Sequence, residues 1–128
     1  MSARHGVLCS LFALLTIASC AQLSKAAEGD AARGQQLFES RCTGCHAMNE
    51  NRAGPKLLGV YGRTSGTAEG FSYSEAIKKA AIVWDEKSLN KWLTDPDEFI
   101  PGNAMDFSLP KAEERQDVIA YLKKSSGR

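Results

Sequence analysis

One pentapeptide, Cys42-Thr43-Gly44-Cys45-His46, decides how the rest of the chain is interpreted. Its two cysteines are three positions apart, so on one helical turn each thiol can form a thioether with one vinyl group of a haem. The histidine that follows can then direct its imidazole at the iron from the same side. The motif therefore predicts one haem c, attached covalently through Cys42 and Cys45, with His46 as an iron ligand.

Zinc binding and disulfide formation are the alternative uses of two neighbouring cysteines. A structural zinc site needs four ligands, and residues 22–128 contain no cysteine or histidine besides those of the motif. A thioredoxin-like redox pair belongs in a βαβ context, and no stretch of the sequence has the period-two alternation of a strand. A structural disulfide remains an alternative in an exported protein, but the complete motif favours haem.

The first 21 residues have the pattern of an export signal. Arg4 is their only charged residue, and the thirteen residues from Val7 to Ser19 are apolar or small. Because a membrane-spanning helix needs about 20 apolar residues, we expect a cleaved signal peptide over residues 1–21. Cleavage after Ala21 and cleavage as late as Ala26 both fit the preference for small residues at such sites.

Two alternatives would keep the chain at a membrane. The segment Ile17-Ala18-Ser19-Cys20 resembles a bacterial lipobox, in which Cys20 is lipidated and becomes the new N-terminus, and the leader can also be retained as an anchor. All three outcomes place the remaining domain outside the cytoplasm, and we expect it in the periplasm. Membrane contact is expected only if Cys20 is lipidated or the leader is retained.

Composition limits the function classes. The 128 residues, 43% hydrophobic and 24% charged, are typical of one small domain. The formal net charge of +1 becomes zero when Arg4 is removed with the leader, so we expect no nucleic-acid partner. Cys9 and Cys20 belong to the leader, which divides the four cysteines into two for export and two for haem.

The hydrophobic pattern predicts an all-α fold of four or five short helices joined by long loops. The predicted helices cover residues 31–41, 74–80, 86–95 and about 111–124. Asp30 and Asp85 can cap two of them, and Pro96 disfavours helix in the residue before it. Residues 47–71, with six glycines or prolines, and residues 99–110 predict loops. Such a chain buries a poor core on its own, so we expect the haem to fill the centre.

Met105 is the expected second axial ligand. Residues 22–128 contain one histidine, which excludes ligation by two histidines, and a methionine thioether is the usual partner in electron carriers. Met48 lies two residues after His46 and is tied to the same side of the haem, whereas Met105 lies 59 residues downstream in a proline-containing loop. A lysine ligand and an open sixth position remain alternatives.

The sequence as a whole resembles the class I c-type cytochromes, which are mitochondrial cytochrome c and its soluble bacterial relatives. The resemblance extends from about Gly29 to Lys124, through CTGCH, GPKLLGVYGR (54–63), GFSYSEA (70–76), the Trp84 region, DPDEFIPGNAM (95–105) and EERQDVIAYLKK (113–124). The number, order and spacing of these segments argue against chance. The resemblance implies that residues 22–128 form a single cytochrome c domain, with its first and last helices crossing beside one haem.

The resemblance also assigns residues around the haem. It implies that the Pro55 carbonyl accepts a hydrogen bond from the His46 imidazole, which fixes the tautomer and strengthens the ligand. It implies that Arg63, Tyr73 and Trp84 hydrogen-bond or neutralise the haem propionates. These four assignments follow from the resemblance alone.

The chain departs from the mitochondrial pattern at several positions. Trp92 stands where those proteins usually have a tyrosine that hydrogen-bonds the methionine sulfur, and Ile77 replaces a polar residue near a buried water. Ala104 replaces a lysine, and Asp97 and Glu98 add acidic groups near the expected haem edge. The ring of lysines that steers mitochondrial cytochrome c to acidic partners is therefore largely missing.

The expected function is that of a monohaem single-electron carrier between redox protein partners in the periplasm. We expect a monomer that is not an enzyme and takes no small-molecule substrate. One alternative is a membrane-tethered electron-transfer subunit of a respiratory complex. Another is a haem sensor or enzyme with a labile sixth ligand.

Overall fold

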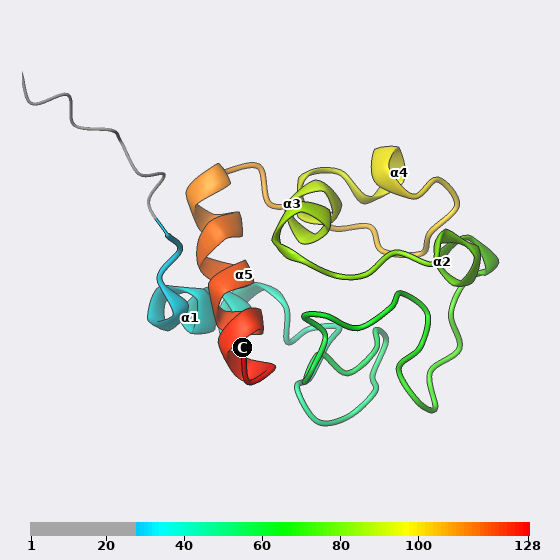
Figure 1. Ribbon diagram of the computed structural model, residues 1–128, viewed down its shortest axis with the longest axis horizontal. Helices are drawn as coiled ribbons and strands as arrows, with labels where there is room; N and C mark the ends of the chain where they lie inside the picture. Colours follow the sequence, from blue (N-terminus) through cyan, green and yellow to red (C-terminus); the bar gives the residue numbers. More distant parts are fainter. Residues whose placement is uncertain (1–27) are drawn as a thin grey trace, which may run out of the picture.

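Five helices occur in residues 28–128, the part of the chain that the computed structural model describes (Figure 1). They are α1 (Ala31–Arg41), α2 (Glu75–Ala80), α3 (Glu86–Thr94), α4 (Pro96–Phe99) and α5 (Ala112–Ser125). Within this part of the chain the only β pairing is an isolated bridge between Thr64 and Val83. The expected all-α class with long loops is confirmed. The predicted leader, with Cys9 and Cys20, lies outside the described residues.

Side-chain caps explain where the first three helices begin. The Asp30 carboxylate accepts hydrogen bonds from the backbone N–H groups of Ala32 and Arg33 at the start of α1. The Ser74 hydroxyl caps α2, and Asp85 forms a reciprocal capping box with Ser88 at the start of α3. These polar side chains satisfy N–H groups that have no partner within the helix, so the starts predicted from the sequence agree with the structure.

Helix α4 is the element that the sequence analysis missed. The predicted helix ends as expected before Pro96, but Asp95 then caps a second, four-residue helix by accepting from the Glu98 N–H. Proline suits the first position of a helix because its missing N–H would have had no partner there. The Asp-Pro-Asp-Glu segment (95–98) therefore ends α3 and begins α4. The loop that carries Met105 follows α4.

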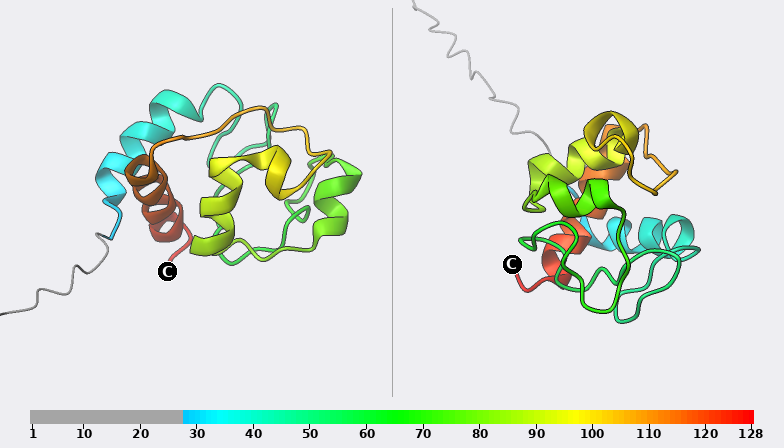
Figure 2. Two further views of the ribbon diagram at one scale, coloured as in Figure 1. Left: turned by 90° about the horizontal axis from the view of Figure 1, so that it is seen from above. Right: turned by 90° about the vertical axis from the view of Figure 1, so that its right-hand side faces the viewer.

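Helices α1 and α5 cross at one end of the molecule, away from α2 and α4 (Figures 1 and 2). The crossing is close because Gly34 has no side chain: a Cβ built there would lie 1.9 Å from the Asp117 carbonyl oxygen. Beside it, the Phe38 and Tyr121 rings pack with centroids 5.5 Å apart. The absence of a side chain at Gly34 therefore permits the close approach of the two terminal helices.

A buried carboxylate connects the same two helices. Asp117 of α5 accepts from Arg33 Nε at 2.8 Å and Arg33 Nη2 at 3.0 Å, and from the Asp30 N–H at 2.6 Å. The Asp117 side chain is only 8% exposed. A paired, hydrogen-bonded carboxylate is tolerated in such a place, so this contact fixes the start of α1 against α5.

The hydrophobic core lies between α5, α3 and the loops. Its buried members are Val60, Ile77, Trp84, Leu89, Leu93, Ile100, Leu109, Val118, Ile119 and Leu122. The long loop after the pentapeptide is held to the α2–α3 connection by Gly62 N–H to Trp84 O at 2.6 Å and Trp84 N–H to Arg63 O at 2.9 Å. None of the helices in the described part is long and apolar enough to cross a membrane.

Candidate haem site

The pentapeptide forms a helical turn at the end of α1. Cys42 is the C-terminal cap of α1, and its carbonyl accepts from the N–H groups of Cys45 at 3.1 Å and His46 at 2.8 Å. The Thr43 hydroxyl donates to the Glu39 carbonyl at 2.7 Å and extends the helix into the motif. The predicted turn therefore presents both thiols and the imidazole from one rigid segment.

The His46 imidazole is held in one orientation. Its Nδ1 lies 2.8 Å from the Pro55 carbonyl oxygen, and because a carbonyl can only accept, the proton of the neutral ring belongs on Nδ1. Burial lowers the pKa of His46, opposed by this hydrogen bond. The ring is therefore neutral at pH 7 and has an unprotonated Nε2 available for a metal.

The backbone also makes room for this ring. A Cβ built on Gly54 would lie 2.3 Å from His46 Cε1 and 2.6 Å from His46 Nδ1. Any other residue at position 54 would displace the imidazole. From the sequence Gly54 is predicted only as a loop residue, and its position directly before Pro55 is the one local signal of this role.

The two thiols differ in their surroundings. Burial raises the pKa of Cys42 to about 11, whereas Cys45 is exposed. The two cysteines are not joined by a disulfide. Among the described residues, no three His, Cys, Asp or Glu side chains converge on a possible metal site, so the zinc alternative has no donor set in this part of the chain.

Two adjoining cavities lie next to the motif, with volumes of about 230 and 310 Å³. Both are lined mainly by apolar residues; we call the smaller one, which also has Arg63 and Tyr73 in its wall, the polar cavity, and the larger one the apolar cavity. Together they are in the range of about 300–1,000 Å³ that is usual for cofactor sites. The residues that line both are His46, Ala53, Trp92, Ala104 and Met105.

The apolar cavity is lined by the two cysteines that are predicted to attach the haem. Cys42 and Cys45 line it together with side chains from α1, α3 and α5 such as Phe38, Leu93 and Val118. Apolar walls of this kind exclude water from a bound cofactor. The predicted thioether residues therefore open onto a space that can accept a large hydrophobic group.

The polar cavity is lined by the four residues to which the family resemblance gives a role around the haem. Pro55, Arg63, Tyr73 and Trp84 all line it. Arg63 donates to the carbonyls of Leu58 at 3.2 Å and Lys56 at 3.0 Å, and burial lowers its pKa. Within residues 28–128 no carboxylate forms an ion pair with Arg63. A half-buried cation with no anionic partner suits an acidic group of a ligand.

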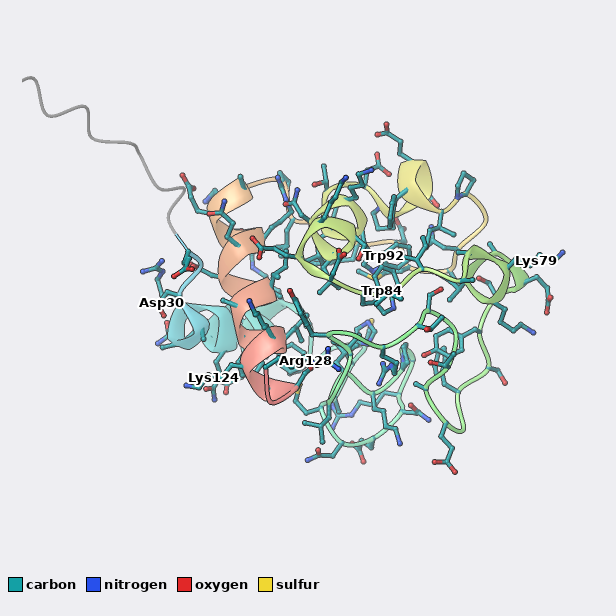
Figure 3. The ribbon with its side chains drawn as sticks, in the orientation of Figure 1. Asp30, Lys79, Trp84, Trp92, Lys124 and Arg128 are labelled. Carbon is teal, nitrogen blue, oxygen red and sulfur yellow. The ribbon has the colours of Figure 1, made fainter. Side chains whose placement is uncertain are left out.

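The other polar groups of this cavity leave donors available. The Tyr73 hydroxyl accepts from the Ala68 N–H at 3.2 Å, which leaves its own O–H free to donate. Trp92, from α3, packs against Trp84 with ring centroids 5.4 Å apart, and Figure 3 shows the two residues next to each other. Ile77, which also lines the cavity, adds an apolar wall.

The two methionines of the described chain are placed differently. Met105 lines both cavities, as His46 does. Met48 lines neither, and its carbonyl accepts from the Leu58 N–H at 2.9 Å within the loop. The thioether that the sequence favours is therefore the one that lines the same two cavities as the imidazole.

These features fit a haem. Two thiols and a neutral imidazole stand on one turn, a thioether lines the same cavities, and Gly54 leaves the imidazole the space it occupies. The polar cavity offers a cation and hydroxyl donors to acidic groups. Haem supplies reversible one-electron chemistry at its iron.

Comparisons with known proteins agree. The sequence model of the cytochrome c family matches residues 31–126. Cytochrome c of Euglena viridis is 54% identical over 98 residues, which is 74% of this chain and 96% of that protein. Cytochrome c of Chlamydomonas reinhardtii is 46% identical over 107 residues, which is 80% of this chain and 96% of that protein.

A solved structure gives the same result. Cytochrome cH from Methylobacterium extorquens matches with a TM-score of 0.72 and 41% identity, covering 75% of this chain and 99% of that one. The fold, the site and these relatives lead to one conclusion: the chain belongs to the cytochrome c family, whose members are electron carriers on a covalently bound haem and not enzymes.

Proposed function

We propose that residues 22–128 form a periplasmic carrier of single electrons, with one haem attached through Cys42 and Cys45 and its iron bound by His46 and Met105. The observation that carries the proposal is that His46 and Met105 line the same two cavities, although they are 59 residues apart in the sequence. Iron held by both residues would have no free position for a substrate and would supply reversible one-electron chemistry, as an electron carrier requires.

Each residue of the chain has a defined part in this proposal. Pro55 holds the His46 ring by accepting its Nδ1–H, which makes the imidazole a better donor. The soft sulfur of Met105 would favour the reduced metal and would raise the reduction potential above that of a two-histidine site. Arg63, Tyr73 and Trp84 neutralise or hydrogen-bond acidic groups at the polar cavity, and the apolar cavity excludes water.

The export part of the proposal rests on residues 1–21. We propose that they are removed as a signal peptide, with cleavage after Ala21 or as late as Ala26. Cell fractionation and the intact mass of the mature protein test this. If the mass shows diacylation at Cys20 or a retained leader, the protein is a membrane-tethered subunit and not a free carrier.

The ligand assignment is tested by an optical redox titration of the purified mature protein and two variants. Met105→Ala should remove the weak near-red band of sulfur bound to ferric iron and lower the potential, because the thioether is lost. Met48→Ala is the matched control, since Met48 lines neither cavity, and its spectrum should equal that of the wild type. A Met105→Ala variant with an unchanged spectrum would refute the assignment.

The attachment is tested separately. Haem should stay with the wild-type protein in acid acetone, and Cys42→Ser or Cys45→Ser should each remove one of two covalent links. Complete extraction of haem from the wild type would contradict the attachment. Rapid carbon monoxide binding by the reduced protein would instead favour a sensor or enzyme with an open sixth position.

A further inference from the structure

The loop that presents Met105 begins with a tight turn after α4. The Asn103 N–H donates to the Ile100 carbonyl at 3.2 Å, with Pro101 and Gly102 at the two central positions. Gly102 has a φ of +84°, as a type II turn requires at its third residue. The turn places Asn103 two residues before Met105 and reverses the chain toward the cavities.

The Asn103 side chain makes three hydrogen bonds at this point. Its Oδ1 accepts from the Met105 N–H at 2.7 Å, and its Nδ2 donates to the Ile100 carbonyl and to Asp97 Oδ1, each at 3.0 Å. An N–H can only donate and a carbonyl can only accept, so these partners determine which way the amide is oriented. Asp97, from α4, therefore accepts a hydrogen bond from the Asn103 side-chain amide, and the oxygen of that amide accepts one from the Met105 N–H.

The rest of this segment has few other restraints. Among the described residues, Ala104 and residues 106–108 make no hydrogen bond, and the next fixed point is the Leu109 N–H, which donates to the Leu93 carbonyl at 2.7 Å. Ala104 and Asp106, on either side of Met105, are exposed. Between Asn103 and Leu109, the bond to Asn103 Oδ1 is thus the one hydrogen bond that holds the chain at Met105.

We propose that Asn103 is a positioning residue for Met105, and that Asp97 supports it through the Asn103 amide. The inference rests on the proposed role of Met105 as an iron ligand. A thioether is a neutral, weakly basic ligand, so its occupancy depends on how well the backbone holds it in place. Without the Asn103 bond the sulfur spends more time away from its position, and external ligands compete more successfully.

The first test compares the ferric holoproteins of the wild type and Asn103→Ala. Imidazole added to the solution should bind about tenfold more tightly to the variant, as expected for the loss of the one hydrogen bond that reaches the Met105 backbone. The near-red sulfur-to-iron band should weaken and the reduction potential should fall, because both report whether the thioether is bound. A purely structural role for Asn103 would lower the denaturant midpoint and leave the band and the potential unchanged.

The second test uses the surface of α4, where a failure to fold is not expected. Asp97→Ala should increase imidazole affinity about two- to threefold, since it removes one of the three contacts of the amide. Glu98→Ala is the matched control: it removes the neighbouring exposed acid, which has no bond to Asn103, and should leave imidazole affinity unchanged. Equal effects of the two substitutions would overturn the role of Asp97.

A charge swap tests the direction of the bond. Asn103→Asp alone sets two carboxylates against each other where a 3.0 Å hydrogen bond existed, and should weaken the near-red band. Adding Asp97→Asn restores one donor and one acceptor at this contact and keeps an acceptor for the Met105 N–H, so the band should recover. A double variant no better than Asn103→Asp would overturn the proposed bond.

Failure of this inference can be told from failure of the proposed ligand. If Met105→Ala removes the near-red band while Asn103→Ala binds imidazole as the wild type does, Met105 is the ligand and Asn103 does not position it. If Met105→Ala keeps the band, the ligand assignment fails and the inference about Asn103 fails with it.

Discussion

Replacing Gly34 by alanine should destabilise the protein, although alanine is the better helix former. Gly34 lies within α1, where alanine would gain about 1 kcal/mol over glycine if no other atoms were near. The structure opposes this gain: the new Cβ would lie 1.9 Å from the Asp117 carbonyl oxygen, 2.5 Å from its carbonyl carbon and 2.9 Å from Tyr121 Cβ. Two of these atoms are backbone of α5, which no side-chain rotation can move.

The size of the effect follows from these distances. Ordinary contacts of a Cβ begin near 3.4 Å, so α1 and α5 must separate by more than an ångström to admit the methyl group. Overpacking of this kind costs about 1–3 kcal/mol or more, and the Phe38–Tyr121 contact and the Asp117 hydrogen bonds are strained by the same movement. After subtracting the propensity gain, we expect a net loss of about 2 kcal/mol in the free energy of unfolding.

Denaturant unfolding of the holoprotein, followed by far-ultraviolet circular dichroism, measures this loss. Gly44→Ala is the matched control, because a Cβ there meets no atom within 4 Å, and its unfolding midpoint should stay close to that of the wild type. A Gly34→Ala variant as stable as the wild type, or more stable, would refute the close crossing of the two helices.

Three further predictions concern pH, backbone strain and charge. The Arg33 guanidinium holds the pKa of Asp117 below its ordinary value, so the carboxylate stabilises the fold above the unfolded pKa of about 4 and this stabilisation is lost as the pH falls through the lower folded pKa. Asp117→Asn should therefore cost about 1–2 kcal/mol at pH 7 and progressively less below pH ~4 in urea titrations; a cost that does not change with pH would contradict the assignment. Ala81 has a left-handed φ of 48°, which costs a non-glycine residue about 1 kcal/mol, so Ala81→Gly should raise the thermal midpoint whereas Ala80→Gly, in the last turn of α2, should lower it. Equal shifts of the two midpoints would show that Ala81 is not strained. Because the charges of residues 22–128 balance, the rate of electron exchange with a protein partner should change less than about threefold between ~0.05 and ~0.2 M salt, and a steep fall measured by stopped-flow absorbance would indicate a strongly charged docking face.

Much of the local structure was predictable because its causes lie within a few residues. Asp30 and Asp85 cap helices through bonds to N–H groups two or three positions away, and Pro96 ends one helix by its own geometry. Helix α4 was missed because four residues have no hydrophobic period to recognise. Asn103 was missed for a related reason, since a loop asparagine is common and its bond to Asp97 depends on where α4 ends.

The amino-acid sequence alone indicates the chemistry of this protein, because two thiols and an imidazole stand at haem-attachment spacing and a candidate thioether follows downstream. Which groups share a space depends on the tertiary fold. The Asp117–Arg33 bond joins residues 84 positions apart, and the walls of the two cavities come from every helix except α4 and from the loops between them. Contacts at such separations depend on how all the elements pack, because the entropy of closing each long loop must be offset by burial elsewhere in the molecule, and no local pattern records that balance.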